Sequence, residues 1–209
     1  MTDLERKLEI LRRLEKHYAD AGPELDFVND FQLLVAVILS AQTTDIQVNQ
    51  VTKKLFLEAP DPETLSQLER SKIEDLIKGV GLYRNKAKNL KAMAQMLLQD
   101  FEGQVPQTRE ELEKLPGVGR KTANVVLSVA FDLPALAVDT HVFRVANRTG
   151  LAAAKNPGQT ESQLCSFIPE KKWAAAHHWF IHHGRYRCKA RNPMCEGCCL
   201  EDVCPKIGL

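Results

Sequence analysis

The sequence predicts an all-α fold, and three observations support this prediction. Apolar residues recur at spacings of three and four, whereas no alternating strand pair and no Asn-Gly hairpin is found. Helix-start patterns recur along the chain. Residues 27–41 are apolar nearly all round, which favours a buried central helix, with a short buried strand as the alternative.

The individual helices can be predicted from these patterns. The first helix is expected to begin at the capping box Thr2–Glu5 and to end at Gly22–Pro23. Its apolar face is predicted to comprise Leu4, Leu8, Leu11, Leu14 and Tyr18. Asp61–Pro62 places a cap before a proline at the first helical position. Further capping boxes are predicted at Ser71–Glu74, Thr108–Glu111 and Thr160–Gln163. The segment FDLPAL at 131–136 is expected to connect two lobes.

The composition is that of an ordinary globular protein. The 209 residues are 44% hydrophobic and 26% charged, enough for one ample domain or two small ones. The first ten residues, MTDLERKLEI, lack the pattern of a secretory signal, and the apolar run at 33–39 is far shorter than the roughly 18 residues of a membrane span. We therefore expect a soluble cytoplasmic protein with no membrane partner.

A local excess of positive charge indicates nucleic acid, although the net charge is only +1. Residues 171–191 hold six basic side chains, four histidines and no carboxylate. A solvated helix end is the alternative. The histidines are His177, His178, His182 and His183. We interpret them as part of a partly buried, partly DNA-facing helix whose apolar stripe is Trp173 and Trp179, rather than as a metal site.

The stretch LEKLPGVGRKTA predicts a helix-hairpin-helix, the phosphate-binding element of DNA-binding proteins. Gly117 and Gly119 form a tight turn, after which the N–H groups of a new helix point outward at its positive end. A P-loop is excluded because no strand precedes the turn and the spacing differs. An ordinary glycine turn between packed helices is the alternative. KGVGLYRNKA at 78–87 resembles this stretch weakly.

Lys121, two residues into the new helix, has two interpretations. It can contact phosphate, or it can act as a nucleophile after losing its proton. Lowering a lysine pKa from ~10.4 to 7–8 costs about 4 kcal/mol, of which a helix dipole supplies only ~0.3–1 kcal/mol. Desolvation would have to supply most of the remainder.

Asp139, in LAVDTHVFRVANRTG, is predicted to be an N-cap that accepts backbone N–H bonds. Such bonds favour the ionised carboxylate. A carboxylate in this position can also stabilise positive charge that develops on a sugar ring. The cap and the catalytic interpretations are compatible.

The last 22 residues hold five of the six cysteines and predict a metal site. Four of them give the spacing C-x6-C-x2-C-x5-C: Cys188, Cys195, Cys198 and Cys204. Sulfur-only ligation in one loop suits a [4Fe–4S] cluster or zinc, and the spacing does not decide between them. Cys199 is left over, and Cys165 is expected to be packed on an amphipathic helix.

The three motifs together resemble the endonuclease III family, the bifunctional DNA glycosylases and abasic-site lyases of base-excision repair. The resemblance covers nearly the whole chain. It implies a six-helix bundle over residues 23–132 and a second lobe, of residues 1–22 and 133–209, that carries a mainly structural [4Fe–4S] cluster. Double-stranded DNA with a damaged base or abasic site would lie in the cleft between the lobes, bound by a monomer at the nucleoid.

The resemblance also assigns the residues. Lys121 and Asp139 match the catalytic pair, and the four cysteines of the C-x6-C-x2-C-x5-C pattern match the cluster ligands. Gln42, in SAQTTD, and Leu82, in GVGLYRNK, match residues that fill the gap left by an extruded base. The expected phosphate contacts are Gly117, Gly119, Lys189 and Arg191. The implied reaction removes oxidised pyrimidines through a lysine Schiff base and cuts the strand by β-elimination.

Three alternatives remain at this point. The related adenine-mismatch glycosylases share the hairpin, the aspartate and the cluster, but generally lack the lysine that stands here at position 121. A non-catalytic DNA-binding protein would bind damaged and intact duplexes alike. An electron-transfer iron–sulfur protein would leave the hairpin and Lys121 unexplained.

Overall fold

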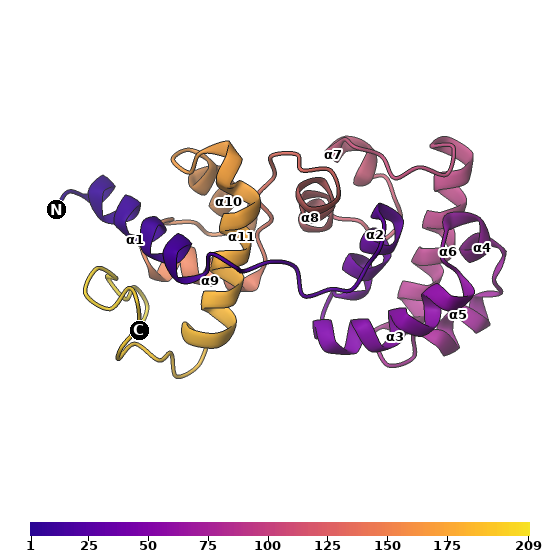
Figure 1. Ribbon diagram of the computed structural model, residues 1–209, viewed down its shortest axis with the longest axis horizontal. Helices are drawn as coiled ribbons and strands as arrows, with labels where there is room; N and C mark the ends of the chain where they lie inside the picture. The colour runs from indigo at the N-terminus through magenta and orange to yellow at the C-terminus, as the bar shows by residue number, and fades with distance from the viewer. The chain divides into compact units, whose positions relative to one another are not determined.

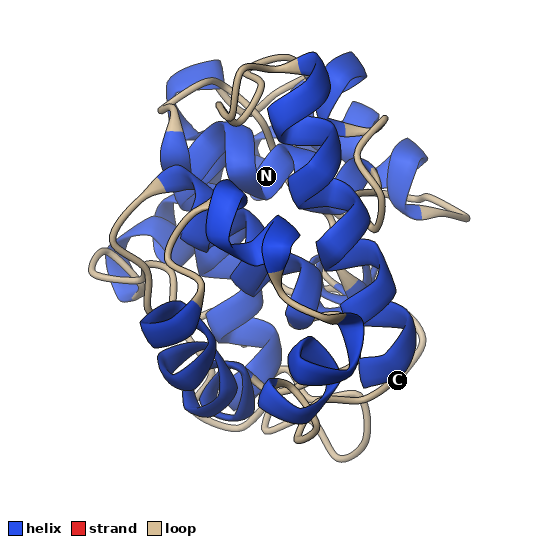
Figure 2. Ribbon diagram, turned by 90° about the vertical axis from the view of Figure 1, so that its right-hand side faces the viewer, coloured by secondary structure: helices blue, strands red, loops and turns tan.

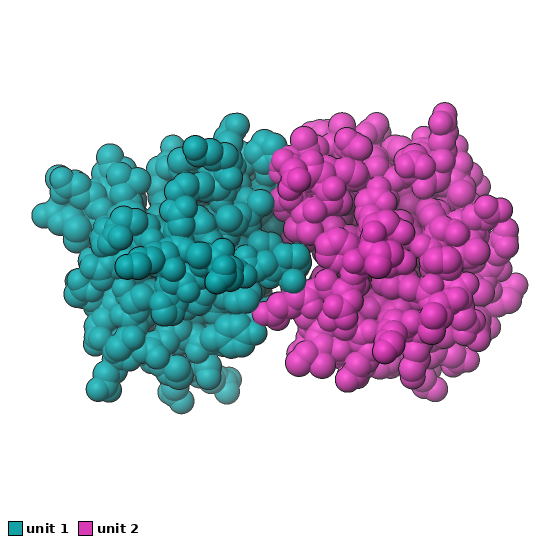
Figure 3. Space-filling model, in the orientation of Figure 1, with its two compact units in different colours: residues 1–23, 134–209 teal, residues 24–133 magenta.

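The structure, a computed structural model, describes residues 1–209 and is built from helices and loops without strands (Figure 2). The all-α prediction is confirmed. No helix is long and apolar enough to cross a membrane. The chain forms two compact units, which we call the central unit (residues 24–133) and the terminal unit (residues 1–23 and 134–209) (Figure 3).

The central unit surrounds one buried helix. Figure 1 traces its helices, which are α2 (Asp30–Leu39), α3 (Asp45–Glu58), α4 (Pro62–Gln67), α5 (Arg70–Leu76), α6 (Tyr83–Asp100), α7 (Arg109–Leu112) and α8 (Arg120–Ala130). Every residue of α2 after Asp30 is buried, and α2 packs against α3, α6 and α8. The prediction of a buried helix is therefore confirmed, and the strand alternative is wrong.

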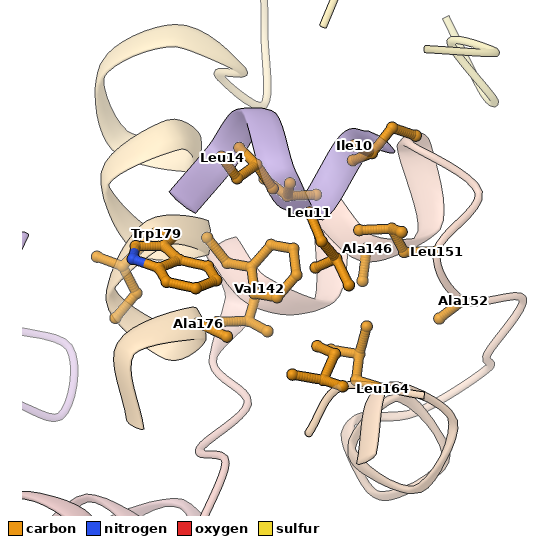
Figure 4. Packing of buried hydrophobic residues seen from close by; sticks show 14 of the residues in the cluster. Ile10, Leu11, Leu14, Val142, Ala146, Leu151, Ala152, Leu164, Ala176 and Trp179 are labelled. Atoms are coloured by element: carbon orange, nitrogen blue, oxygen red, sulfur yellow. The ribbon is translucent and has the colours of Figure 1, made fainter. Parts of the chain in front are cut away.

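The terminal unit combines the first helix with the last third of the chain. Its helices are α1 (Asp3–His17), α9 (Thr140–Arg148), α10 (Pro157–Cys165), η1 (Glu170–Lys172), α11 (Trp173–His182) and the π-helix η2 (His183–Arg187). Leu14, Val142 and Trp179 meet in its core, from α1, α9 and α11 (Figure 4). Cys165 packs against this core, as predicted.

The first helix differs from its prediction in which residues are buried. The capping box Thr2–Glu5 is present. However, Leu4 and Leu8 are 56% and 48% exposed, because the core includes residues of α1 only from Ile10 onward. The helix also ends at His17, before Gly22.

Two other predicted helix starts are confirmed. Asp61 caps α4, with Pro62 at the first helical position, and the Thr108 hydroxyl accepts the N–H of Glu111 at the start of α7.

Two predicted capping boxes are wrong because a neighbouring start takes precedence. At Ser71–Glu74 the helix has already begun at Arg70, whose guanidinium pairs with Glu74 at 2.8 Å. At Thr160–Gln163 the helix begins earlier, at Asn156–Pro157, which combines a capping side chain with a proline at the first position. Thr160 lies inside α10 and bonds to the Asn156 carbonyl.

Candidate active site

The turn between α7 and α8 requires a glycine at one position and leaves open space at another. Gly117 has φ +87°, and a Cβ there would lie 3.2 Å from the Asn89 side chain and 3.4 Å from that of Ile38. Gly119 is the N-cap of α8 in extended backbone, with no atom within 4 Å of its Cβ position. No side chain caps α8, so its first N–H groups suit an incoming anion.

Lys121 is the second residue of α8, and its side chain is half-buried. Because this position is close to the positive end of the helix dipole, the dipole disfavours the charged ammonium form of Lys121. The next residues of α8 anchor the helix in the core, since Asn124 is buried and accepts a hydrogen bond from Arg109 at 2.9 Å.

Asp139 caps α9, as predicted. Its Oδ1 accepts the N–H groups of His141 and Val142, both at 2.8 Å. Neither of these two bonds involves Oδ2. The geometry therefore holds the carboxylate at the helix start through one oxygen, while its catalytic role stays a prediction.

His141, two residues after Asp139, was missed by the sequence reasoning. Burial lowers the pKa of His141, although the neighbouring Asp139 carboxylate opposes this. Arg144 Nη2 lies 3.2 Å from His141 Nδ1, and a guanidinium only donates, so Nδ1 accepts and the neutral ring carries its proton on Nε2. Arg144 also donates to the Gly184 carbonyl at 2.9 Å.

The close approach of η2 to α9 requires the glycine at position 184. A Cβ on Gly184 would lie 2.9 Å from the Cβ of His141 and 3.2 Å from Arg144 Nη2. Two residues in the sequence could have indicated this contact between η2 and α9: the histidine in VDTH and the glycine in HHGR. Neither residue is a specific signal by itself.

Gln42 and Leu82 share an unusual backbone conformation. Both are exposed and both lie in the left-handed region, with φ 56° and 57°. Leu82 is 65% exposed and precedes α6. Six non-glycine residues of the chain have positive φ, and Leu82 is the one among them with an exposed aliphatic side chain; backbone strain of this kind concentrates at functional sites.

The four cysteines of the predicted pattern line one pocket of the terminal unit, together with Arg148, His183 and Leu200. Arg148 Nη1 donates to the Cys188 sulfur at 3.4 Å, and the Leu200 N–H donates to that of Cys198 at 3.4 Å. Burial raises the pKa of Cys188, but hydrogen bonds from His183 and Arg148 outweigh it and hold this pKa below its ordinary value. These residues fit a group that binds thiolates.

Cys199 lies outside the lining of this pocket. Its side chain packs against the core, and its carbonyl accepts a bond from Arg13 at 3.1 Å. His183, Cys198 and Cys199 nevertheless form a group that could hold a metal ion, with ligand atoms within 4.8 Å of one another. His183 is thus the one member of the histidine run that lies beside the cysteines in this group.

The rest of the basic segment divides into buried and exposed parts. His177 is buried beside the Ala137 carbonyl, at 2.8 Å from Nδ1. Trp179 is buried and Trp173 partly buried, which confirms the apolar stripe. Lys189 and Arg191 are exposed on the loop between Cys188 and Cys195.

Comparisons with known proteins identify the family. Residues 35–170 match the HhH-GPD superfamily base excision DNA repair proteins. The chain is 48% identical to endonuclease III of Escherichia coli (strain K12) over 199 residues, covering 95% of this chain and 94% of that one. It is 47% identical to endonuclease III of Bacillus subtilis (strain 168), with coverages of 93% and 89%. This chain belongs to the endonuclease III family.

Solved structures agree. An endonuclease III–DNA complex described as a trapped covalent intermediate matches with a TM-score of 0.95 and 45% identity, covering 99% of this chain and 97% of that one. A non-covalent endonuclease III–DNA complex matches with the same TM-score and coverage at 44% identity. As a member of this family, the protein binds DNA and is a DNA glycosylase and abasic-site lyase of base-excision repair, as the motifs predicted.

Proposed function

We propose that this protein acts as a monomer at the nucleoid on duplex DNA with an oxidised pyrimidine or an abasic site, and that Lys121 is its nucleophile. The observation that carries the proposal is the half-buried lysine in the first turn of a helix that no side chain caps. The trapped covalent endonuclease III–DNA complex supports it, since a trapped intermediate requires a covalent bond between enzyme and DNA.

In the proposed reaction the neutral amine of Lys121 attacks C1′ of the deoxyribose, and the C1′–N bond breaks as the base leaves with its electron pair. Asp139 stabilises the positive charge on the sugar, or relays the proton that the lysine nitrogen loses. The sugar ring then opens: the C1′–O4′ bond breaks, O4′ takes up a proton, and the C1′=N bond to Lys121 forms. This Schiff base acidifies the C2′ proton. Loss of this proton expels the 3′ phosphate by β-elimination, and water then releases Lys121.

The target nucleotide must first leave the base stack, because its C1′ cannot be reached inside a duplex. We propose that Gln42 and Leu82 fill the gap that it leaves. Gly117, Gly119, Lys189 and Arg191 would contact phosphates and hold the distorted duplex.

The four pocket cysteines are proposed to hold a [4Fe–4S] cluster: Cys188, Cys195, Cys198 and Cys204. The cluster would supply a rigid covalent anchor for the C-terminal loop, which carries Lys189 and Arg191. It would take no part in the chemistry at C1′.

A borohydride trap tests the function. The protein is incubated with duplexes that carry thymine glycol, an abasic site, or A opposite 8-oxoguanine, and borohydride reduces any Schiff base to a stable cross-link. We expect cross-links with the first two substrates and none with the third. Release of adenine from the third substrate without any cross-link would support an adenine-mismatch enzyme instead.

Leu82→Ala is expected to slow base release from duplex DNA about tenfold, because the smaller side chain fills less of the gap. Leu57→Ala is the matched control, since Leu57 is another exposed leucine of the central unit, 82% exposed on α3. Single-turnover release of thymine glycol measures both variants. Equal rates for Leu82→Ala and the unaltered protein would argue against the role of Leu82.

Adjacent cysteines test the cluster. Cys198→Ser is expected to lose most bound iron and the broad visible absorption of a [4Fe–4S] protein, whereas Cys199→Ser keeps both, because only Cys198 lines the pocket. Iron, sulfide and zinc contents are measured with the spectrum. If the protein is colourless and contains one equivalent of zinc, the four cysteines hold zinc and the proposal of a [4Fe–4S] cluster is wrong.

A further inference from the structure

A buried lysine of the central unit has all its hydrogen-bond donors in use. Lys86, on α6, is only 5% exposed. Its ammonium donates to the carbonyls of Leu39 at 2.8 Å and Ala41 at 2.6 Å, and to the hydroxyl of Thr43 at 3.2 Å. An ammonium has three N–H donors, so these acceptors account for all of them. None of the three acceptors is a carboxylate, so this charge is held by backbone and hydroxyl dipoles.

The three acceptors surround one residue, Gln42. Leu39 is the last residue of α2, where carbonyls point outward and favour a cation. Ala41 and Thr43 are the neighbours of Gln42 in the chain. The ammonium therefore defines the turn in which Gln42 adopts φ 56°.

The backbone of Lys86 holds a second turn. Its N–H donates to the Leu82 carbonyl at 3.0 Å, at the residue with φ 57°. The two turns also touch, because a Cβ on Gly81 would lie 3.4 Å from the Gln42 carbonyl oxygen. One residue thus ties together the only two turns to which gap filling is assigned.

We propose that Lys86 is a positioning residue that presents Gln42 and Leu82 as one preformed pair for insertion into the duplex. The inference rests on the proposed role of those two residues and adds what holds them in place. A pair ordered before binding loses less conformational freedom when it enters DNA. Lys86 itself need not contact DNA.

Lys86→Met tests this inference, because it removes the ammonium and keeps the stem and the backbone N–H. The extrusion rate is followed by the fluorescence of 2-aminopurine placed beside an abasic-site analogue in a duplex. We expect extrusion to slow about tenfold. Borohydride trapping on a single-stranded abasic site should change less than twofold, because a single strand has no gap to fill.

Lys91→Met is the matched control. Lys91 lies on the same helix and donates to the Leu68 carbonyl at 2.7 Å, so the change removes a lysine–carbonyl bond remote from the two turns. Both rates should be unchanged. The inference would be overturned if Lys91→Met slowed extrusion as much as Lys86→Met does. It would also be overturned if Lys86→Met slowed trapping on the single-stranded abasic site as much as it slows extrusion from the duplex.

A double-mutant cycle adds a readout that general destabilisation would not move. If Lys86 acts through Gln42, the extrusion rate of Lys86→Met combined with Gln42→Ala should equal that of the slower single variant, within twofold. If the two substitutions instead slow extrusion by the product of their separate factors, the inference is contradicted.

If Lys86→Met fails to fold, the Thr43→Val variant tests the inference in its place. It removes one acceptor at similar volume, and unchanged extrusion would overturn the inference, whereas a two- to threefold loss supports it.

The outcomes also separate this inference from the proposed function. If the unaltered protein forms no borohydride cross-link with any substrate, the claim that Lys121 is the nucleophile is wrong. The 2-aminopurine fluorescence would still measure extrusion and so still test the role of Lys86. Normal trapping together with normal extrusion by Lys86→Met would remove only the role of Lys86.

Discussion

Lys121→Gln is expected to lower base release and strand cleavage by at least about a thousandfold and to abolish the borohydride cross-link. The amide of glutamine is not nucleophilic and forms no Schiff base. Single-turnover kinetics on thymine glycol and abasic-site duplexes measure the loss, and the cross-link is read on a denaturing gel.

Lys121→Arg distinguishes the two interpretations of this side chain. A guanidinium contacts phosphate at least as well as an ammonium, but it stays protonated in proteins and cannot attack C1′. If Lys121 only binds phosphate, the arginine variant keeps most of the activity. We expect it to bind duplex DNA normally and to be as inactive as Lys121→Gln.

The structure supports the expectation that either variant folds. Lys121 is half-buried in the first turn of α8, whereas α8 is anchored by the buried segment from Ala123 to Ser128. A change of melting temperature of more than a few degrees would mean that the lysine also stabilises the fold.

The sequence predicts the local features of this protein where one strong signal acts alone. The apolar run of α2 is too long for a typical strand, and α2 is a buried helix as predicted. The glycine turn before α8 and the cap at Asp139 are also found where the motifs place them. These features depend on nearest neighbours in the chain, which the sequence contains directly.

Predictions fail where neighbouring signals compete or where packing decides. Thr160–Gln163 is a valid capping pattern, but Asn156–Pro157 begins the same helix earlier. Leu4 continues the apolar face of α1, but the core begins only at Ile10. Which part of an amphipathic face is covered depends on elements that are distant in the sequence.

The residues that support the site were the hardest to predict. Lys86 and Arg144 resemble ordinary surface cations in the sequence, but in the fold they bond to acceptors far away in the chain. Lys86 bonds to residues more than 40 positions earlier, and Arg144 bonds to Gly184. A charged side chain whose acceptors are backbone carbonyls has no partner of opposite charge by which to recognise it.

Asp139→Asn is expected to slow base release by about 100- to 1,000-fold while the protein keeps its fold. Asparagine is as good an N-cap as aspartate, and its Oδ1 can accept the same N–H groups of His141 and Val142. The substitution therefore removes the negative charge and preserves the cap. Asp139→Ala removes both and should in addition destabilise the fold by about 1 kcal/mol.

Asp61→Asn is the matched control for Asp139→Asn. Asp61 caps α4 through its Oδ1, which accepts the N–H of Thr64 at 2.8 Å. Both substitutions make the same chemical change at a helix start, so their effects on melting temperature should agree within a few degrees. Only the change at position 139 should affect base release.

The two activities of the enzyme separate the possible roles of Asp139 further. Base release requires stabilisation of the charge on the sugar, whereas strand cleavage at a preformed abasic site begins from an aldehyde and needs no base to depart. Asp139→Asn should therefore slow release from thymine glycol far more than cleavage at an abasic site, with duplex binding unchanged. If the variant mainly unfolds and its folded fraction releases the base at the normal rate, Asp139 is a helix cap and the charge on the sugar is stabilised by another group.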